Sequence, residues 1–534
     1  MFNCPGCGAG MRYDIKTGKM LCDHCGTSCK VQEHPAQSLM AAQDDYETTV
    51  FTCPQCGGRI LSTDHAASDF CTYCGASVTL QGRLSSEKKP ERIVPFSRTR
   101  EECRESYRNH TRKIWCLPSE YRSDQFLDKF EGIYIPFWIY QAAQIGPAML
   151  GGHRTSGNYI EYCHLNFDLN SHYDWIAFDA ASLFDDEISS EINTFDESEA
   201  VPFNPAYLSG LYADIPDVDA SVYQKEAENE ANRETVRRVK ASGHFKGMKI
   251  EESGNYSAIL NTRPAGHRSA MFPVWFVTWR NKDRVVYAAV NGRSGDCAAD
   301  FPVSFSKYLL TSLLISLPCI LLFLMLPVMM AKTLLTVALM IGVVMMVLYY
   351  RSAVRTAARE LHFLDKGYMS SRPASEVPSF LKSAQRKMED RKRSGKGEKN
   401  TVAVWIGLIF AGSLMMILPA LVSSGVPIGN ILFPAAALAA IVGAVIFIIK
   451  GARITRVIRF PRIILDCLIL SVCCTAAAVI GIINPVHDYY YYFGAVLVMG
   501  GIIAAVLGLV VQYNRLCTHP IPEYFNREEV GKNA

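Results

Sequence analysis

Two groups of four cysteines have the residue type and spacing best suited to chemistry in this chain. Each group consists of two CxxC pairs separated by fourteen residues, and the second group lies 49 residues after the first, which indicates an internal duplication. The eight residues are Cys4, Cys7, Cys22, Cys25, Cys53, Cys56, Cys71 and Cys74. A CxxC turn places two sulfurs on one side of an ion and a returning hairpin brings the other two. Each group therefore predicts one tetrahedral Zn²⁺ site.

Two structural zinc ions, in ribbons at residues 1–30 and 50–80, are the favoured interpretation. A closed site of four thiolates has no open coordination position, so we expect the metal to stabilise a small fold and not to catalyse. A glycine follows the second cysteine of each pair, where a tight turn is needed: Gly8, Gly26, Gly57 and Gly75. An iron site of the rubredoxin type and a redox-active CxxC pair are the alternatives.

Nucleic-acid binding by the ribbons is a further alternative. The first ribbon carries Arg12, Lys16 and Lys19, but neither ribbon has the aromatic and basic platform on which bases stack. We therefore expect the ribbons to dock on protein. The chain also contains no GxSxG, P-loop, dinucleotide-binding or HExxH motif, so we expect a protein that is not an enzyme.

Six long apolar runs dominate the C-terminal part of the chain. Each has the length that a helix needs to cross a hydrocarbon layer of roughly 30 Å. The runs are Tyr308–Met330, Thr333–Tyr350, Thr401–Val422, Ile431–Ile449, Ile463–Ile483 and Phe493–Tyr513. We predict a six-helix transmembrane domain over residues 307–515.

The charges of the connections predict the orientation of these spans. The loop 351–400 holds thirteen Lys and Arg against six Asp and Glu, and the loop 450–462 holds five Lys and Arg and no acid. Positive loops stay in the cytoplasm, so both chain ends, including the tail 516–534, are expected there. The basic run at 386–399 could also hold anionic lipid.

Residues 91–306 predict a cytosolic domain of the α+β class. We expect strands at 93–96, 133–140, 256–260, 272–279 and 284–290, and helices from Ser97 or Thr99 to about Trp115 and over 220–241. Pro136 predicts that the second of these strands lies at a sheet edge or bulge. The last two strands predict a hairpin around residues 281–283.

Two charge patterns stand out in this domain. Four arginines at every fourth position predict a basic stripe on one helix face: Arg100, Arg104, Arg108 and Arg112. The neighbouring residues Glu101, Glu102 and Glu105 can form ion pairs with this stripe. From Thr155 to Gln224 there is no Lys or Arg and there are fourteen Asp and Glu. That segment could accept a basic partner or merely keep the surface soluble.

A transporter or channel with a zinc-ribbon regulatory domain is the main rival to a membrane anchor. Ionisable residues inside spans mark ion and substrate paths, but the six runs contain only Asp466. It lies near the cytoplasmic end of its run, so we expect an interfacial side chain. Ala436, Ala440 and Ala444 have the spacing of a close helix contact, which favours a compact bundle or an oligomer seam.

Several segments also carry a family resemblance: the CPxCG turns that begin at Cys4 and Cys53, and residues 93–96, 132–138, 204–210, 272–276 and 290–295. On these segments the chain resembles bacterial membrane proteins with amino-terminal zinc ribbons of the TFIIB type, often labelled primosomal-helicase-like. No helicase motif is present. The resemblance covers residues 1–306. Two ribbons and six spans depart from the smaller relatives.

Some of these relatives stand beside SPFH (flotillin-like) or phage-shock-protein-A-like partners. The resemblance therefore implies a multi-pass adaptor of the bacterial inner membrane that recruits such a protein, with a role in membrane stress.

Overall fold

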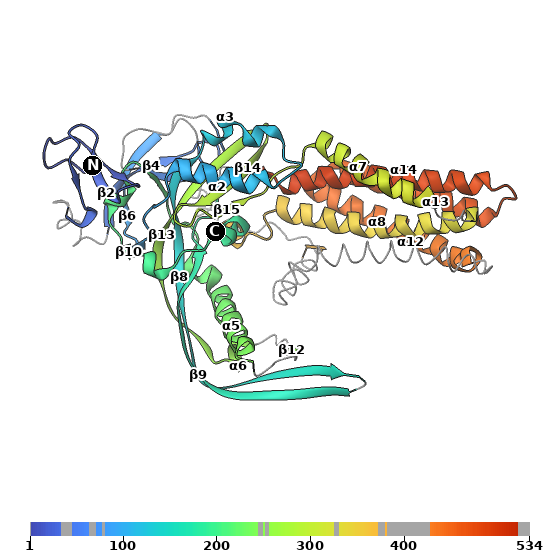
Figure 1. Cartoon of the computed structure of the whole chain (residues 1–534), viewed down its shortest axis with the longest axis horizontal. Coiled ribbons are helices and arrows are strands. Elements are labelled where there is room, and N and C mark those ends of the chain that lie inside the picture. Colours follow the sequence, from blue (N-terminus) through green and yellow to red (C-terminus); the bar gives the residue numbers. More distant parts are fainter. Residues whose placement is uncertain are drawn as a thin grey trace, which may run out of the picture.

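The computed structural model describes residues 2–33, 45–62, 71–76, 81–157, 159–243, 249–250, 256–324, 330–371, 380–381 and 428–521. A head domain of ribbons and strands lies at one end, and a bundle of long helices lies at the other (Figure 1). A two-stranded arm leaves the head domain and bends toward the side of the bundle (Figure 1). The predicted organisation is therefore confirmed in outline: the structure has two cysteine groups, a domain of helices and strands, and long apolar helices.

The first ribbon is a small antiparallel sheet of its own. Its strands are β1 Met11–Asp14, β2 Lys19–Cys22 and β3 Ser28–Cys29, in that order, and a 3-10 turn at Val31–Glu33 follows them. Met11 and Met20 are buried between the strands and the head domain, so the ribbon has only a minimal core. A unit of this size needs a metal ion to be stable.

The second ribbon, in contrast, is built into the main sheet. Its strands are β4 Asp45–Thr52, β5 Arg59–Ser62 and β6 Gln81–Lys88. Strand β11, Tyr212–Asp214, pairs with β5 on one side and with the long strand β8, Glu131–Ser156, on the other. The described part of residues 50–80 is thus continuous with the head domain.

The main sheet has the strand order β10-β7-β13-β8-β11-β5-β4-β6, and further strands attach beside it. Among the described residues only the pairs β11–β8 and β13–β7 are parallel, which agrees with the predicted α+β class. The predicted hairpin is formed by β13 and β14. The remaining strands are β7 Arg92–Ile93, β9 Tyr159–Asp179, β10 Val201–Pro202, β12 Lys249–Ile250, β13 Thr262–Asn281, β14 Arg284–Asn291, β15 Cys297–Ala299 and β16 His519–Pro520.

The prediction that Pro136 marks an edge or a bulge is wrong, because β8 is a central strand. On one side Pro136 lies opposite Met271 of β13. On the other side β11 pairs with β8 only as far as Tyr134, and β9 pairs with it from Phe137 onward. The proline lies where one partner strand ends and the next begins, so its missing N–H leaves no ladder bond unmade.

The helices of the head domain follow most of the predictions. Helix α2, Arg100–Arg112, begins at Thr99, whose side chain forms a capping box with Glu102. The predicted helix 220–241 is a 3-10 turn, η5 Ala220–Tyr223, followed by α5 Gln224–Ala241. Residues 256–260 were predicted as a strand and instead contain the short helix α6, Tyr256–Ile259. The other elements are η2 Ser119–Arg122, α3 Asp124–Leu127, α4 Asp186–Ile192, η3 Glu197–Glu199 and η4 Pro205–Leu208.

Two arginines of the α2 stripe form ion pairs, and their partners are not the predicted acids. Arg104 lies 2.8 Å from Asp128, and Arg108 lies 2.9 Å from Asp124. Both carboxylates belong to α3 or to the residue that follows it, not to α2. The stripe therefore joins two elements of the head domain.

The bundle contains the four described helices that are long and apolar enough to cross a membrane, which indicates a membrane protein. They are α8 Ala331–Glu360, α12 Ile428–Ile458, α13 Pro461–Ile483 and α14 Tyr489–Leu516, and a short helix α9, Lys366–Ser371, follows α8. α8 and α13 each pack against both α12 and α14.

The predicted number of six spans is corrected to four in the described part of the chain. The first predicted span, Tyr308–Met330, overlaps helix α7, Phe305–Leu324, which is not among the four. Leu313, Leu314 and Leu317 of α7 are each more than half exposed, so this helix lies outside the bundle core. The predicted span Thr401–Val422 and the basic run 386–399 lie outside the described residues.

Ion pairs join the head domain to the bundle. Arg359, near the end of α8, lies 3.6 Å from Asp185, 2.7 Å from Glu187 and 2.8 Å from Asp300. Part of the acidic segment 155–224 thus binds a base of its own chain rather than a foreign partner. Strand β16, which follows α14, pairs with β14, so the chain returns to the head domain after the last bundle helix.

Candidate metal centres and a candidate docking pocket

All four CxxC turns adopt the same backbone geometry. In each turn the first cysteine donates its N–H to the carbonyl five residues later and accepts the N–H of the glycine four residues later, as Cys4 does with Ala9 and Gly8. The four glycines Gly8, Gly26, Gly57 and Gly75 have φ of 77°, 71°, 72° and 63°. The left-handed conformation explains why glycine is required, as predicted.

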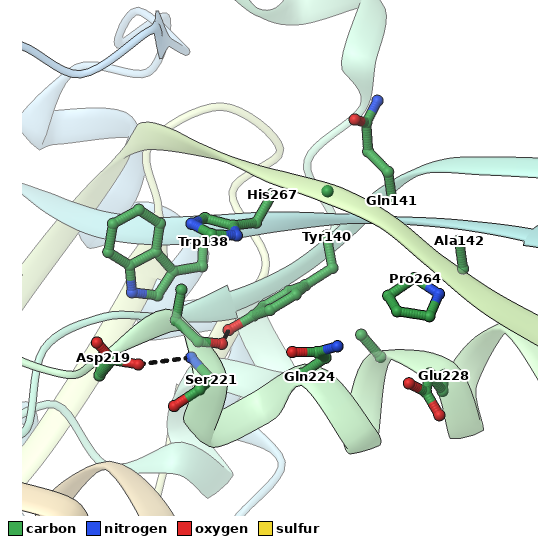
Figure 2. Close-up of a pocket in the computed structure, with 13 residues that line it drawn as sticks. Trp138, Tyr140, Gln141, Ala142, Asp219, Ser221, Gln224, Glu228, Pro264 and His267 are labelled. Atoms are coloured by element: carbon green, nitrogen blue, oxygen red, sulfur yellow. Dashed lines mark hydrogen bonds between the residues drawn. The ribbon is translucent and has the colours of Figure 1, made fainter.

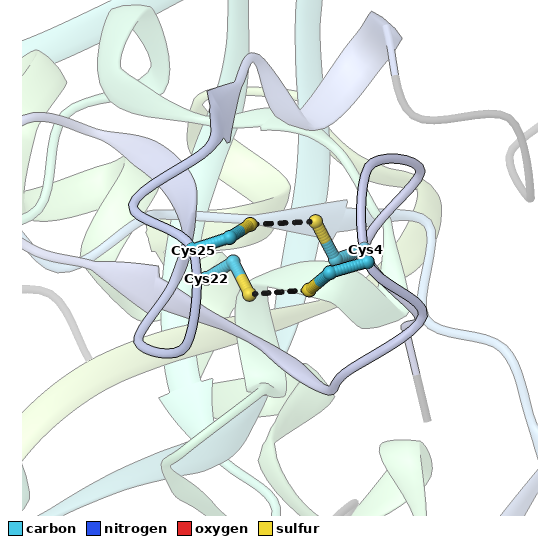
Figure 3. A group of neighbouring side chains, drawn as sticks. Cys4, Cys22 and Cys25 are labelled. Atoms are coloured by element: carbon cyan, nitrogen blue, oxygen red, sulfur yellow. Dashed lines mark hydrogen bonds between the residues drawn. The ribbon is translucent and has the colours of Figure 1, made fainter.

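The four sulfurs of each group converge. In the first group Sγ of Cys4 lies 3.5 Å from Sγ of Cys25, and Sγ of Cys7 lies 3.6 Å from Sγ of Cys22 (Figure 3). In the second group the corresponding distances are 3.7 Å and 3.6 Å. The four sulfurs of each group lie within 4.8 Å of one another. A tetrahedron with Zn–S bonds of about 2.3 Å has edges of about 3.8 Å, so both groups fit zinc.

Backbone N–H groups support the sulfurs from outside. Gly6 donates to Sγ of Cys4, and Gly58 donates to Sγ of Cys56, each at 3.4 Å. Such bonds stabilise thiolates and orient them toward the ion. A zinc ion bound there would cross-link the two turns of each ribbon.

The two sites differ in burial despite their common origin. All four cysteines of the second site are buried, whereas Cys7 and Cys25 of the first site are exposed. The duplication alone predicts two equivalent ribbons. The difference arises because the second ribbon continues into the main sheet and the first does not.

The head domain encloses the second site through the turn at Cys71 and Cys74. Tyr73, between them, donates its hydroxyl to Asp214 of β11, and Thr278 of β13 donates to the carbonyl of Thr72. Burial and the nearby carboxylate of Asp217 raise the pKa of Asp214 to about 7. Leu183 and Arg280 pack close to the glycines of this site.

Tyr13 of β1 makes the hydrogen bonds that attach the first ribbon to the head domain. Its N–H donates to the carbonyl of Ser209 at 3.1 Å, and its hydroxyl donates to the carbonyl of Phe96 at 3.3 Å. Its ring meets Tyr207 edge to face with centroids 5.2 Å apart. Segments 93–96 and 204–210, which carry the family resemblance, therefore form the surface on which the first ribbon packs.

A cavity of about 300 Å³ opens on the head domain between β8, β13 and the start of α5 (Figure 2). Aromatic rings form one wall: Trp138 and Tyr140 come from β8, and His267 comes from β13. The rings of Trp138 and His267 meet edge to face at 5.4 Å. Trp138 and Tyr140 are fixed by hydrogen bonds to the carbonyls of Val218 and Ala220, at 2.8 Å and 2.6 Å.

Two carboxylate side chains also line the cavity. Asp219 caps η5 by accepting the N–H of Ser221 at 2.8 Å, and Glu228 lies on α5 (Figure 2). The hydroxyl and N–H of Ser221 lower the pKa of Asp219, so its carboxylate is ionised at neutral pH. Sequence reasoning did not find this pocket, because its residues come from three distant segments. The acidity of residues 155–224, which include Asp219, was the only signal.

Asp466 lies near the domain-side end of α13, and its side chain is buried among the helices of the bundle. The hydroxyl of Tyr349 on α8 donates to it at 2.7 Å, and Nε of Arg462 lies 3.1 Å away. Gly508 of α14 leaves the space for this carboxylate. Gln512 of α14 is also buried, and its amide has no hydrogen-bond partner among the described residues.

Comparisons with known proteins give one relative. No family model and no solved structure matches the chain. A Bacillus subtilis (strain 168) protein described as "Uncharacterized protein YdjG" is 30% identical over 322 residues, which cover 57% of this chain and 91% of that protein. Since the match extends over nearly all of that relative, the chain belongs to the family of YdjG.

Proposed function

We propose that this protein is a non-enzymatic membrane adaptor that recruits a cytosolic protein to the bilayer. The observation that carries the proposal is the pocket on the head domain, where aromatic rings and two carboxylates converge. Aromatic faces and carboxylates together favour a cation. A partner would supply it as the side chain of a lysine or arginine.

The size of the pocket supports this assignment. About 300 Å³ lies at the lower limit of cavities that hold small molecules, and it accommodates one long side chain with its flanking backbone. Asp219 and His267 are exposed, so the pocket is accessible from the surface. The Asp219 carboxylate provides the charge, and the rings of Trp138 and Tyr140 cover the apolar stem of the guest.

The attachment of the head domain supports the anchoring role. Ion pairs at Arg359 and Glu360 join α8 to the head domain, so a protein held at the pocket stays at a fixed position relative to the bundle. In this proposal the bundle lies in a bacterial inner membrane, and the head domain and both chain ends are cytoplasmic. The zinc ions stabilise the surface that the partner meets.

The resemblance to zinc-ribbon membrane proteins suggests the partner. We propose an SPFH-type or phage-shock-like protein, whose recruitment would connect the adaptor to membrane stress. Lipid at the basic run 386–399 and assembly into homo-oligomers are compatible with this role.

Titration of the purified full-length protein with short peptides tests the pocket. An arginine-containing peptide is expected to bind, and its citrulline counterpart is expected not to bind. Binding should be lost in the Asp219→Asn, Glu228→Gln variant and kept in a control with the same charge change on α2, Glu101→Gln, Glu105→Gln. Equal binding to both variants would remove the pocket from the proposal.

Transport is the second candidate, and the buried group of Asp466, Tyr349 and Gln512 favours it. A carboxylate and an amide inside a bundle of spans are costly unless they have a function. Proteoliposomes loaded with pH-sensitive and Na⁺-sensitive dyes test this role. A flux that disappears with Asp466→Asn supports transport, whereas liposomes as tight as empty ones exclude a proton or sodium path.

A further inference from the structure

The arm consists of the outer parts of β8 and β9, residues 142–157 and 159–173. The two strands pair without interruption from Ala142 with Tyr173 to Ser156 with Tyr159. The arm first runs away from the head domain and then bends, so that its outer part is aligned with the long axis of the bundle (Figure 1). Its tip reaches past the head-side ends of the bundle helices and lies level with the half of the bundle that is nearer the head domain (Figure 1).

Packing covers the arm as far as Gly152, where Ile250 of β12 pairs with β8 and packs against the arm. Ala148, Leu150 and Leu169 form a small core with Leu260, which follows α6. Beyond this core the arm exposes large side chains: Tyr159 is 81% exposed, Tyr162 63% and Ile160 55%. Large apolar side chains that gather on an exposed surface mark a contact site.

The tip carries no net charge. Arg154 and Glu161 face each other across the strands, with Nε 2.6 Å from the carboxylate. They are the only Lys, Arg, Asp or Glu residues between Ile145 and Leu165. The acidic character of the segment 155–224, which predicts repulsion from anionic lipid, therefore begins only beyond the tip.

Tyrosine with an adjacent aliphatic residue is typical of side chains that occupy the headgroup layer of a membrane. There the apolar part of the ring contacts lipid and its hydroxyl contacts water. A second exposed aromatic residue has the same character and lies where the head domain meets the first apolar helix. Trp115 of the head domain is 75% exposed and donates Nε1–H to Thr311 on α7, at the start of the first apolar helix. The arm tip likewise lies level with the half of the bundle that is nearer the head domain (Figure 1).

We propose that the arm is a second membrane contact, whose tip residues Tyr159, Ile160 and Tyr162 enter the lipid headgroup layer on the side of the head domain. The arm lies in this layer and does not cross the hydrocarbon, because β9 has no partner on its outer edge among the described strands and its N–H and C=O groups there would stay unpaired in lipid. The contact holds the head domain against the bilayer at a distance from the bundle. This inference does not depend on the recruitment of a partner.

Photo-crosslinking of the full-length protein in lipid nanodiscs tests the proposal. A benzophenone amino acid replaces Tyr159 in one sample and Ile145 in a control. Ile145 lies on the same arm with 59% exposure but far from the tip. Nanodiscs of neutral lipid alone and with added anionic lipid are compared, and adducts are identified by intact mass.

A lipid adduct at position 159 in both kinds of nanodisc, absent at position 145, is the expected result. Adding Ile160→Ser and Tyr162→Ser to the probe at 159 should reduce that adduct to the level at 145. A cross-linked dimer at 159 instead of a lipid adduct would show that a second copy covers the tip, and no adduct would show that the tip stays in water. Either result overturns the proposal.

Discussion

Glu360, the last residue of α8, is bound by Arg284 at the start of β14 in a two-point ion pair. The two bonds measure 3.2 Å and 2.7 Å, and the Glu360 side chain is only 9% exposed. Arg515 of α14 binds the same carboxylate at 2.9 Å and 3.0 Å. One carboxylate thus joins the sheet, the first bundle helix and the last.

Replacement of this carboxylate is expected to loosen the head domain from the bundle. Glu360→Gln leaves two largely buried guanidinium groups without their anion, a loss that costs about 3 to 5 kcal/mol in comparable buried pairs. Thermal unfolding and limited proteolysis of the detergent-solubilised protein measure it. Glu161→Gln, which breaks the exposed pair at the arm tip, is the control and should change stability by about 0 to 1 kcal/mol. Equal effects of the two variants would contradict the account of the junction.

Zinc is expected to leave the two sites at different rates. The intact protein should contain two zinc ions, and a chelator should remove one of them first, because Cys7 and Cys25 are exposed while the second site is buried. Release of zinc to a colorimetric chelator measures the two phases. Cys4→Ser, Cys7→Ser should remove the fast phase only. A single phase for both ions would contradict the structural difference between the ribbons.

Loss of the second zinc site is expected to unfold the head domain. Zinc binding contributes on the order of 10 kcal/mol to the folding of small zinc peptides, and here the ribbon is continuous with the main sheet. Cys53→Ser, Cys56→Ser should therefore lose strand signal in circular dichroism. The Cys4→Ser, Cys7→Ser variant should keep it. A fully folded Cys53→Ser, Cys56→Ser variant would show that the sheet does not need the ion.

Glycine is expected to matter at one bundle position and not at another. A methyl group at Gly481 of α13 would overlap the ring of Phe433 on α12, whereas nothing lies within 4 Å of a methyl at Gly500 of α14. Gly481→Ala should destabilise the bundle by about 1 to 3 kcal/mol through overpacking. Gly500→Ala should not destabilise it. Thermal melting in detergent compares the two, and an equal loss would argue against the packing of α12 on α13.

Stability of the junction is expected to fall in acid because of His519. Burial, together with Arg359, His362 and Arg284, lowers the pKa of His519 to about 3, against the opposing charge of Asp185. Below pH 6.5 the unfolded chain therefore binds a proton that the folded chain does not. Stability is lost as the pH falls from about 6.5 toward 3, on the order of 2 kcal/mol by pH 5. His519→Gln should flatten this part of the melting profile, and an unchanged profile would contradict the prediction.

Local chemistry explains what could be predicted from the sequence. Ligand pairs such as Cys4 with Cys7 are set by a four-residue turn, so spacing alone predicts the eight ligands. The length and composition of the apolar run Ile463–Ile483 likewise predict its helix directly. Residues 256–259 form a helix and not the predicted strand, because so short an apolar run fits either structure and its neighbours decide.

Long-range contacts explain what could not be predicted. Trp138, Asp219 and His267 meet only because β8, η5 and β13 are brought together by the sheet. The burial of Asp466 likewise depends on Tyr349 of α8, 117 positions away along the chain. The prediction for Pro136 was wrong for the same kind of reason. The gap in strand pairing between β11 and β9, where this proline lies, is created by strand order and not by local sequence.

The adaptor proposal is tested most directly by cross-linked affinity purification of the full-length protein from native membranes. Wild type, the pocket variant Asp219→Asn, Glu228→Gln and the control Glu101→Gln, Glu105→Gln are compared at equal amounts in the membrane. The account predicts that an SPFH-type or phage-shock-like protein is enriched with wild type and control and lost with the pocket variant. Enrichment that is the same for all three proteins, or no enriched cytosolic protein at all, would contradict it.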